Sequence, residues 1–122
     1  MLPKEVEVVV VGGGPTGLVL TSTLRQAGHD VLTLDRQAEG ANASRAAAIH
    51  ARTLQVLREL DVTDRLVAEG VIVPTFTFRD RDKILTRLDF SALPTPYPFV
   101  LTLQQYRTEK ILTKPCMLSV AR

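Results

Sequence analysis

The sequence has 122 residues, 45% hydrophobic and 23% charged, and this length and composition predict one soluble globular domain. Its 15 basic and 13 acidic residues give a net charge of +2 and are scattered, which argues against nucleic-acid binding and against attachment to an anionic membrane. The single cysteine, Cys116, has no partner for a disulfide or a metal pair, so we expect no metal site. No signal-peptide pattern is found, and the apolar run Val8–Val11 is too short to cross a bilayer. We therefore expect a cytoplasmic protein.

The first 35 residues have the pattern of a β-α-β unit. Glu5–Val11 is an apolar, β-branched run, which predicts a strand buried on both faces, as in a parallel sheet. A helix is predicted between Pro15, a residue suited to a first helical turn, and Gly28, a residue suited to the position after a helix end. Val31–Asp35 predicts a second strand, and about thirty residues is the length of a parallel crossover.

The turn between this strand and helix has the pattern G-x-G-x-x-G. The first glycine permits the tight turn, the second lets a pyrophosphate approach the backbone, and the third lets the helix pack closely on the strand. The N–H groups and the dipole of the helix N-terminus also favour phosphate. We therefore expect the pyrophosphate of a dinucleotide to be bound by Gly12, Gly14, Pro15, Thr16 and Gly17.

Asp35 ends the second strand about twenty residues after the glycines, where a carboxylate accepts hydrogen bonds from an adenosine ribose. Arg36 follows and could instead indicate a site for a 2′-phosphate. Because Asp35 would repel that phosphate, the pair favours the unphosphorylated ribose of FAD or NAD over NADP.

The middle of the chain predicts a loop and two helices. Arg36–Ala43 is polar and small, and Ser44–Leu60 has apolar residues at helical spacing. A shorter helix is expected to end at Gly70, with Asp61 and Asp64 as capping residues at its start.

The last third of the chain predicts mainly extended structure. Val71–Leu88 alternates apolar residues around a turn at Arg79–Asp82, which indicates an antiparallel β-hairpin. Three prolines between residues 94 and 98 predict a connector, Phe99–Leu103 a strand, and Gln105–Leu112 a helix. The chain is therefore expected to have an α/β fold: an incomplete Rossmann-type βαβ domain with an antiparallel β-hairpin insertion.

Three blocks of the sequence resemble the FAD-dependent aromatic hydroxylases, the phenol and para-hydroxybenzoate hydroxylase-like flavoprotein monooxygenases. These are the glycine turn with Asp35-Arg36, the Ser44-Arg45-Ala46 block with the helix after it, and the block that begins at Gln105. One difference from the family is Asp61, which stands where a glycine is usual.

The resemblance runs from about Glu5 to Leu112. Residues 1–112 are thus identified as the N-terminal part of an FAD-binding domain, and residues 113–122 as a tail that departs from the family pattern, with Pro115 interrupting the expected helix. The later Asp-Gly and Gly-Asp motifs of the family are not found. These departures indicate either a fragment or a reading frame lost near Thr113.

The resemblance implies roles for two further residues. Arg45 would contact the cofactor near its pyrophosphate or ribityl chain, since a guanidinium can pair with phosphate through two hydrogen bonds; the alternative is a surface arginine at a helix start. Gln105 would bond the ribityl and isoalloxazine side; the alternative is an ordinary helix-cap amide, and a shift of one residue would exchange it with Gln104.

The activity implied by the resemblance is hydroxylation of a small aromatic or phenolic substrate by an FAD-dependent monooxygenase, with NAD(P)H as reductant and O2 as oxidant. No catalytic side chain is assigned, because the cofactor carries the chemistry. Two alternatives remain open: a catalytically inactive nucleotide-binding fragment and an NAD-dependent dehydrogenase domain. The sequence does not specify the substrate, the choice between NADH and NADPH, or the oligomeric state.

Overall fold

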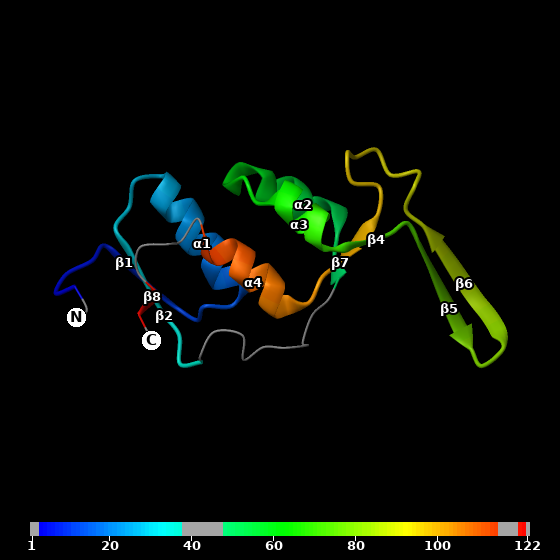
Figure 1. The fold of residues 1–122 in the computed structure, drawn as a ribbon, viewed down its shortest axis with the longest axis horizontal. Helices are drawn as coiled ribbons and strands as arrows, with labels where there is room; N and C mark the ends of the chain where they lie inside the picture. The colour runs from blue at the N-terminus through cyan, green and yellow to red at the C-terminus, as the bar shows by residue number, and fades with distance from the viewer. Residues whose placement is uncertain (1–2, 38–47, 115–119, 122) are drawn as a thin grey trace. The chain divides into compact units, whose positions relative to one another are not determined.

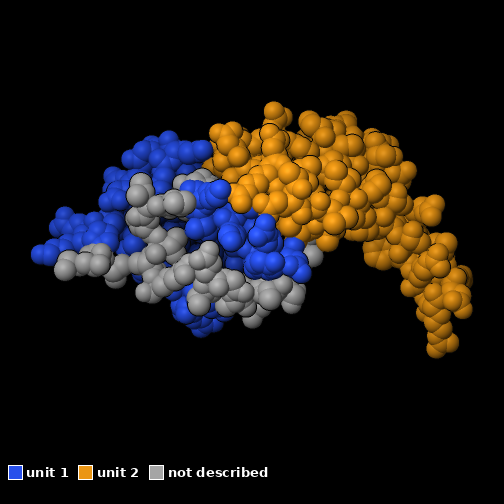
Figure 2. All heavy atoms as spheres, in the orientation of Figure 1, with its two compact units in different colours: residues 1–46, 104–122 blue, residues 47–103 orange. Residues whose placement is uncertain are grey.

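The computed structural model describes residues 3–37, 48–114 and 120–121. The chain forms two compact units, one of residues 1–46 with 104–122 and the other of residues 47–103, shown in different colours in Figure 2. Unit 1 contains parallel strands and two helices, and unit 2 contains antiparallel strands with short helices. No helix among the described residues has the length and apolar character needed to cross a membrane.

Unit 1 is the predicted β-α-β unit with two later elements added to it (Figure 1). Its elements are β1 (Val8–Val11), α1 (Pro15–Gln26), β2 (Val31–Leu34), α4 (Gln105–Thr113) and β8 (Val120–Ala121). The strand order is β1-β2-β8, and both pairs of neighbours are parallel. The α/β class and the crossover are therefore confirmed, although β1 begins at Val8 rather than at Glu5.

The core of unit 1 lies between the sheet and its helices. Val10 and Val31 of the sheet, Leu18 of α1, and Ile111 and Leu112 of α4 are buried. In contrast, β1 lies at the edge of the described sheet, and its Val11 is 84% exposed.

A pair of buried hydroxyl groups attaches α1 to β2. The Oγ1 atoms of Thr21 and Thr33 are 2.6 Å apart, and the Thr21 hydroxyl also bonds the carbonyl oxygen of Gly17 at 2.8 Å. Because both hydroxyls have partners, their burial carries little desolvation penalty. The bonds fix the first turns of α1, which follow the glycine turn.

Unit 2 contains two antiparallel sheets. Its elements are β3 (Ala48–Ile49), α2 (Ala51–Leu57), a 3-10 helix (Arg58–Leu60), α3 (Thr63–Glu69), β4 (Val71–Val73), β5 (Thr75–Asp80), β6 (Lys83–Asp89) and β7 (Val100–Thr102). The strand order is β3-β7-β4 in one sheet, and β5 pairs with β6 in the other. The buried side chains of Leu54, Leu66 and Leu101 form the centre of this unit.

The long helix expected over Ser44–Leu60 is wrong at residues 48–50. Residues 44–47 lie outside the described residues, β3 occupies 48–49, and α2 begins only at Ala51. Ile49 pairs with Leu101 in the sheet and is buried there, so a tertiary contact overrides the helical spacing of the sequence.

The expected capping roles of Asp61 and Asp64 are also wrong. Val62 is the N-cap residue of α3 and makes no side-chain cap. Asp61 instead follows the 3-10 helix with a left-handed backbone, φ 55°, and Asp64 lies within the first turn of α3. The nearby hydroxyl of Thr63 donates to the carbonyl of Leu54 at 2.8 Å and joins α3 to α2.

The predicted antiparallel hairpin is confirmed, but it is shorter than Val71–Leu88. Its strands are β5 and β6, which pair from Thr75↔Asp89 to Asp80↔Lys83 with an irregularity after Phe78. The segment before it, β4, pairs with β7 instead. Pro74 separates β4 from β5, because proline cannot donate a ladder hydrogen bond.

Candidate functional site

The glycine turn joins the carboxyl end of β1 to the N-terminus of α1. Gly12 has φ +109°, a conformation that favours glycine, and its N–H donates to the carbonyl of Leu34 at 2.7 Å. At Gly17 an added Cβ would lie 1.8 Å from the carbonyl oxygen of Gly12, so only glycine fits. Backbone conformation and packing therefore explain the first and third glycines of the motif.

Neither reason explains the second glycine, Gly14. Its φ of −73° and ψ of −179° are open to any residue, and an added Cβ would meet no atom of the described residues within 4 Å. Gly14 is the N-cap residue of α1 and makes no side-chain cap, so the N-cap residue supplies no side-chain partner to the first-turn N–H groups of the helix. A pyrophosphate could approach the backbone here, where a side chain would stand in its way, so the turn fits a dinucleotide.

Asp35 lies directly after β2 and is bound to the backbone by both carboxylate oxygens. Its Oδ2 accepts the N–H of Gly13 at 2.5 Å, and its Oδ1 accepts the N–H of Gln37 at 2.7 Å. The N–H of Gln37 and then that of Gly13 are the main causes that lower the pKa of the Asp35 carboxyl, and the charge of Arg36 lowers it further. Asp35 is therefore an anion at neutral pH.

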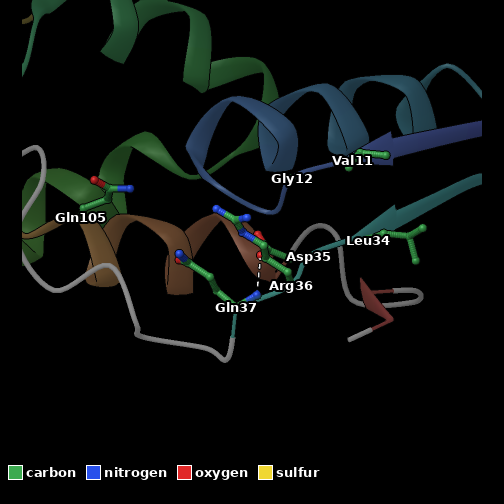
Figure 3. A pocket seen from close by; sticks show the side chains of 7 residues that line it. All are labelled: Val11, Gly12, Leu34, Asp35, Arg36, Gln37 and Gln105. Atoms are coloured by element: carbon green, nitrogen blue, oxygen red, sulfur yellow. Dashed lines mark hydrogen bonds between the residues drawn. The ribbon is translucent and has the colours of Figure 1, made fainter.

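A pocket of about 440 Å³ opens at the carboxyl ends of β1 and β2, within the size range of small-ligand sites (Figure 3). The residues that line it are Val11, Gly12, Leu34, Asp35, Arg36, Gln37 and Gln105. Gln105 comes from the start of α4, so the fold brings a residue of the last helix to the glycine turn.

The structure brings most of the predicted site residues together. Gly12, Asp35, Arg36 and Gln105 line the pocket, and Gly14, Pro15, Thr16 and Gly17 form the adjoining turn and first helical residues. Arg45 lies outside the described residues.

The two neighbouring glutamines of α4 differ in their environment. Gln105 is half-buried and donates to Glu109 at 2.8 Å, whereas Gln104 is exposed and contributes its backbone carbonyl to the helix start. Of the two, only Gln105 lines the pocket. The sequence left open which of these two glutamines faces the site, and the pocket lining favours Gln105.

Two residues of the site were missed in the sequence. Gln37 lines the pocket and donates its N–H to Asp35, and Gly13 donates from the other side. The signal for Gln37 was its position two residues after an aspartate, where an Asp side chain commonly bonds the backbone. Gly13 occupies an unspecified position of the motif, so the pattern gave no reason to single it out.

Comparisons with known proteins identify the family of the chain. Residues 5–117 match the family described as FAD binding domain. The 6-methylpretetramide 4-monooxygenase of Streptomyces rimosus is 43% identical over 116 residues, which cover 91% of this chain and 21% of that protein. The pentachlorophenol 4-monooxygenase of Sphingobium chlorophenolicum is 34% identical over 109 residues, covering 88% of this chain and 20% of that protein.

A solved structure shows the same fold. The anhydrotetracycline hydroxylase OxyS of Streptomyces rimosus is similar with a TM-score of 0.81 and 35% identity, covering 96% of this chain and 24% of that chain. The chain spans about a fifth of the length of the curated relatives it matches.

Proposed function

We propose, from the premise that this chain belongs to the FAD-binding-domain family, that its glycine turn and pocket hold the ADP part of FAD. The observation that carries this proposal is the open face at Gly14, where neither backbone conformation nor packing requires a glycine. Asp35, an anion fixed beside that turn, supplies the acceptor that an unphosphorylated ribose needs.

Each predicted site residue has a role in this proposal. The pyrophosphate is bound at the turn formed by Gly12, Gly14, Pro15, Thr16 and Gly17. Asp35 accepts hydrogen bonds from the ribose hydroxyls, and Arg36 borders the same pocket. Arg45 is assigned to the pyrophosphate or ribityl chain, and Gln105 to the ribityl and isoalloxazine side, by resemblance to the family. Residues 1–112 are then the N-terminal part of the FAD-binding domain, with residues 113–122 as a tail that departs from the family pattern.

The protein to which these residues belong is proposed to be a flavin-dependent monooxygenase that hydroxylates a small aromatic or phenolic substrate. The names of the relatives, which include a pentachlorophenol 4-monooxygenase, support this substrate class. Bound FAD would supply the redox chemistry, with NAD(P)H as reductant and O2 as oxidant. The residues of this chain bind and orient the cofactor. We also propose that the protein is located in the cytoplasm.

A second candidate is a nucleotide-binding module without catalytic activity of its own. The observation that favours it is that the residues brought together at the pocket and the glycine turn are assigned to cofactor binding, and none of them is assigned a catalytic role. Both candidates require FAD binding, and they differ in whether NAD(P)H oxidation accompanies it.

Flavin retention tests the proposal. The purified chain is incubated with FAD, the excess is removed, and the visible spectrum and the bound fraction are recorded. We expect bound flavin with a shifted spectrum, and its loss in Gly14→Val, because the valine side chain would occupy the open face of the turn. A folded wild-type chain without flavin would contradict FAD binding, and displacement of flavin by NAD would favour a dehydrogenase. NAD(P)H oxidation by the flavin-loaded chain then separates the two candidates.

A further inference from the structure

Gly13 occupies a position of the glycine motif where the pattern specifies no residue. Its φ is not in the positive region, in contrast to Gly12 and Gly28, so the backbone alone does not require glycine. An added Cβ at Gly13 would lie 2.9 Å from Oδ2 of Asp35 and 3.2 Å from its Cβ. The side chain of Asp35 therefore occupies the space that a side chain at position 13 would need.

The same two residues are joined by a short hydrogen bond. The N–H of Gly13 donates to Oδ2 of Asp35 at 2.5 Å, and the N–H of Gln37 donates to the other oxygen at 2.7 Å. These donors belong to two segments of unit 1, the glycine turn and the chain after β2. The carboxylate is thus held between them in one orientation at the edge of the pocket.

A carboxylate has about four acceptor sites. Among the described residues the backbone N–H groups of Gln37, Gly13 and Arg36 donate to Asp35, which leaves acceptor capacity on the carboxylate. We propose that Gly13 is a positioning residue for ribose recognition: its missing side chain and its N–H together hold the Asp35 carboxylate against the turn, with its remaining acceptor sites available to the ribose hydroxyls. This inference rests on the proposed function, because it requires the ADP part of the cofactor to lie in this pocket.

A positioning role and a merely structural role of Gly13 have different consequences. If Gly13 only stabilised the turn, its replacement would weaken every ligand of the turn by the same factor. If it positions Asp35, its replacement specifically removes the advantage that a ligand gains from its ribose hydroxyls. The test is therefore the ratio of two affinities rather than one affinity.

The experiment measures the Kd of ADP and of 2′,3′-dideoxy-ADP for the full 122-residue chain. We expect the wild type to bind ADP about tenfold more tightly, because hydrogen bonds to a charged acceptor contribute this much. In Gly13→Ala this ratio should fall towards one. The matched variant Gly14→Ala, whose added Cβ meets no atom of the described residues within 4 Å, should weaken both ligands and keep the ratio.

The outcomes separate the inference from the proposed function. A ratio of about ten in both wild type and Gly13→Ala would overturn the positioning role and leave the ribose site intact. Equal binding of the two nucleotides by the wild type would overturn the ribose role of Asp35 together with the inference. Binding of neither nucleotide nor FAD would overturn the proposed function itself.

A second measurement applies even if Gly13→Ala fails to fold. Asp35→Ala opens space instead of filling it, so it breaks the bond to Gly13 without a clash. Amide hydrogen exchange at Gly13 should then become at least about tenfold faster, while exchange at Gly12, bonded to Leu34, should not change. Unchanged exchange at Gly13 would overturn the inference.

Discussion

The carbonyl oxygen of Gly12 occupies the space beside Gly17 that a Cβ at position 17 would need. The two would be 1.8 Å apart, far inside contact distance, and the oxygen belongs to the backbone and cannot rotate away. This close approach brings the first turn of α1 against the end of β1, and Gly14 is the N-cap residue of that helix.

Replacement of Gly17 by alanine should therefore lower the stability of the ligand-free chain. The cost should be at least about 1–3 kcal/mol, as for overpacking in a rigid site. Urea unfolding monitored by circular dichroism measures it. Gly14→Ala serves as the matched control, since its added Cβ meets no atom within 4 Å in the described part of the chain and should change stability much less. Equal losses in both variants would contradict the close packing.

The Asp35 carboxyl predicts a dependence of stability on pH. The N–H groups of Gln37 and Gly13 lower the pKa of this carboxyl in the folded chain. Its contribution to the free energy of unfolding is therefore complete above the ordinary pKa of about 3.8 and is lost as the pH falls through the folded pKa. Asp35→Asn should flatten the fall in unfolding free energy below about pH 4 relative to wild type. Glu7 and Asp89 also have lowered pKa values and remain in both proteins, so the difference between the two curves isolates Asp35.

The hydroxyl pair of Thr21 and Thr33 should contribute to stability through its two bonds. Thr21→Val leaves the buried Thr33 hydroxyl without its partner and should cost about 1–3 kcal/mol. The double variant with Thr33→Val should cost less than the sum of the two single changes, because no buried hydroxyl then remains unpaired. A double-mutant cycle of urea unfolding measures the coupling, and strictly additive costs would show that the pair is not coupled.

Asp61→Gly should stabilise the chain. Asp61 has a left-handed backbone after the 3-10 helix, a conformation that glycine adopts without penalty, and the gain should be about 0.5–1 kcal/mol. The control is Asp64→Gly, within α3, which should instead destabilise by about 1 kcal/mol because glycine is a poor helix former. Thermal unfolding of both variants should give shifts of opposite sign. A lower Tm for Asp61→Gly would show that the Asp61 side chain contributes more than its backbone conformation costs.

The sequence alone determined the β-α-β unit, the glycine turn and the acid after β2. These features depend on residues that are close in the chain: an apolar strand, a glycine-rich turn, a proline at the start of α1 and Asp35 at the end of the next strand. Their conformations follow from local backbone preferences and from spacing, which a single sequence displays.

Only the tertiary structure decided the contacts between distant segments. Ile49 follows a helical pattern but forms a strand with Leu101, and β4 pairs with β7 rather than with the segment after Pro74. Gln105 reaches the glycine turn, and Gly13 is paired with Asp35, 22 residues away. Strand pairing and side-chain contact depend on which groups meet in space, and the spacing of residues along one chain carries little information about those partners.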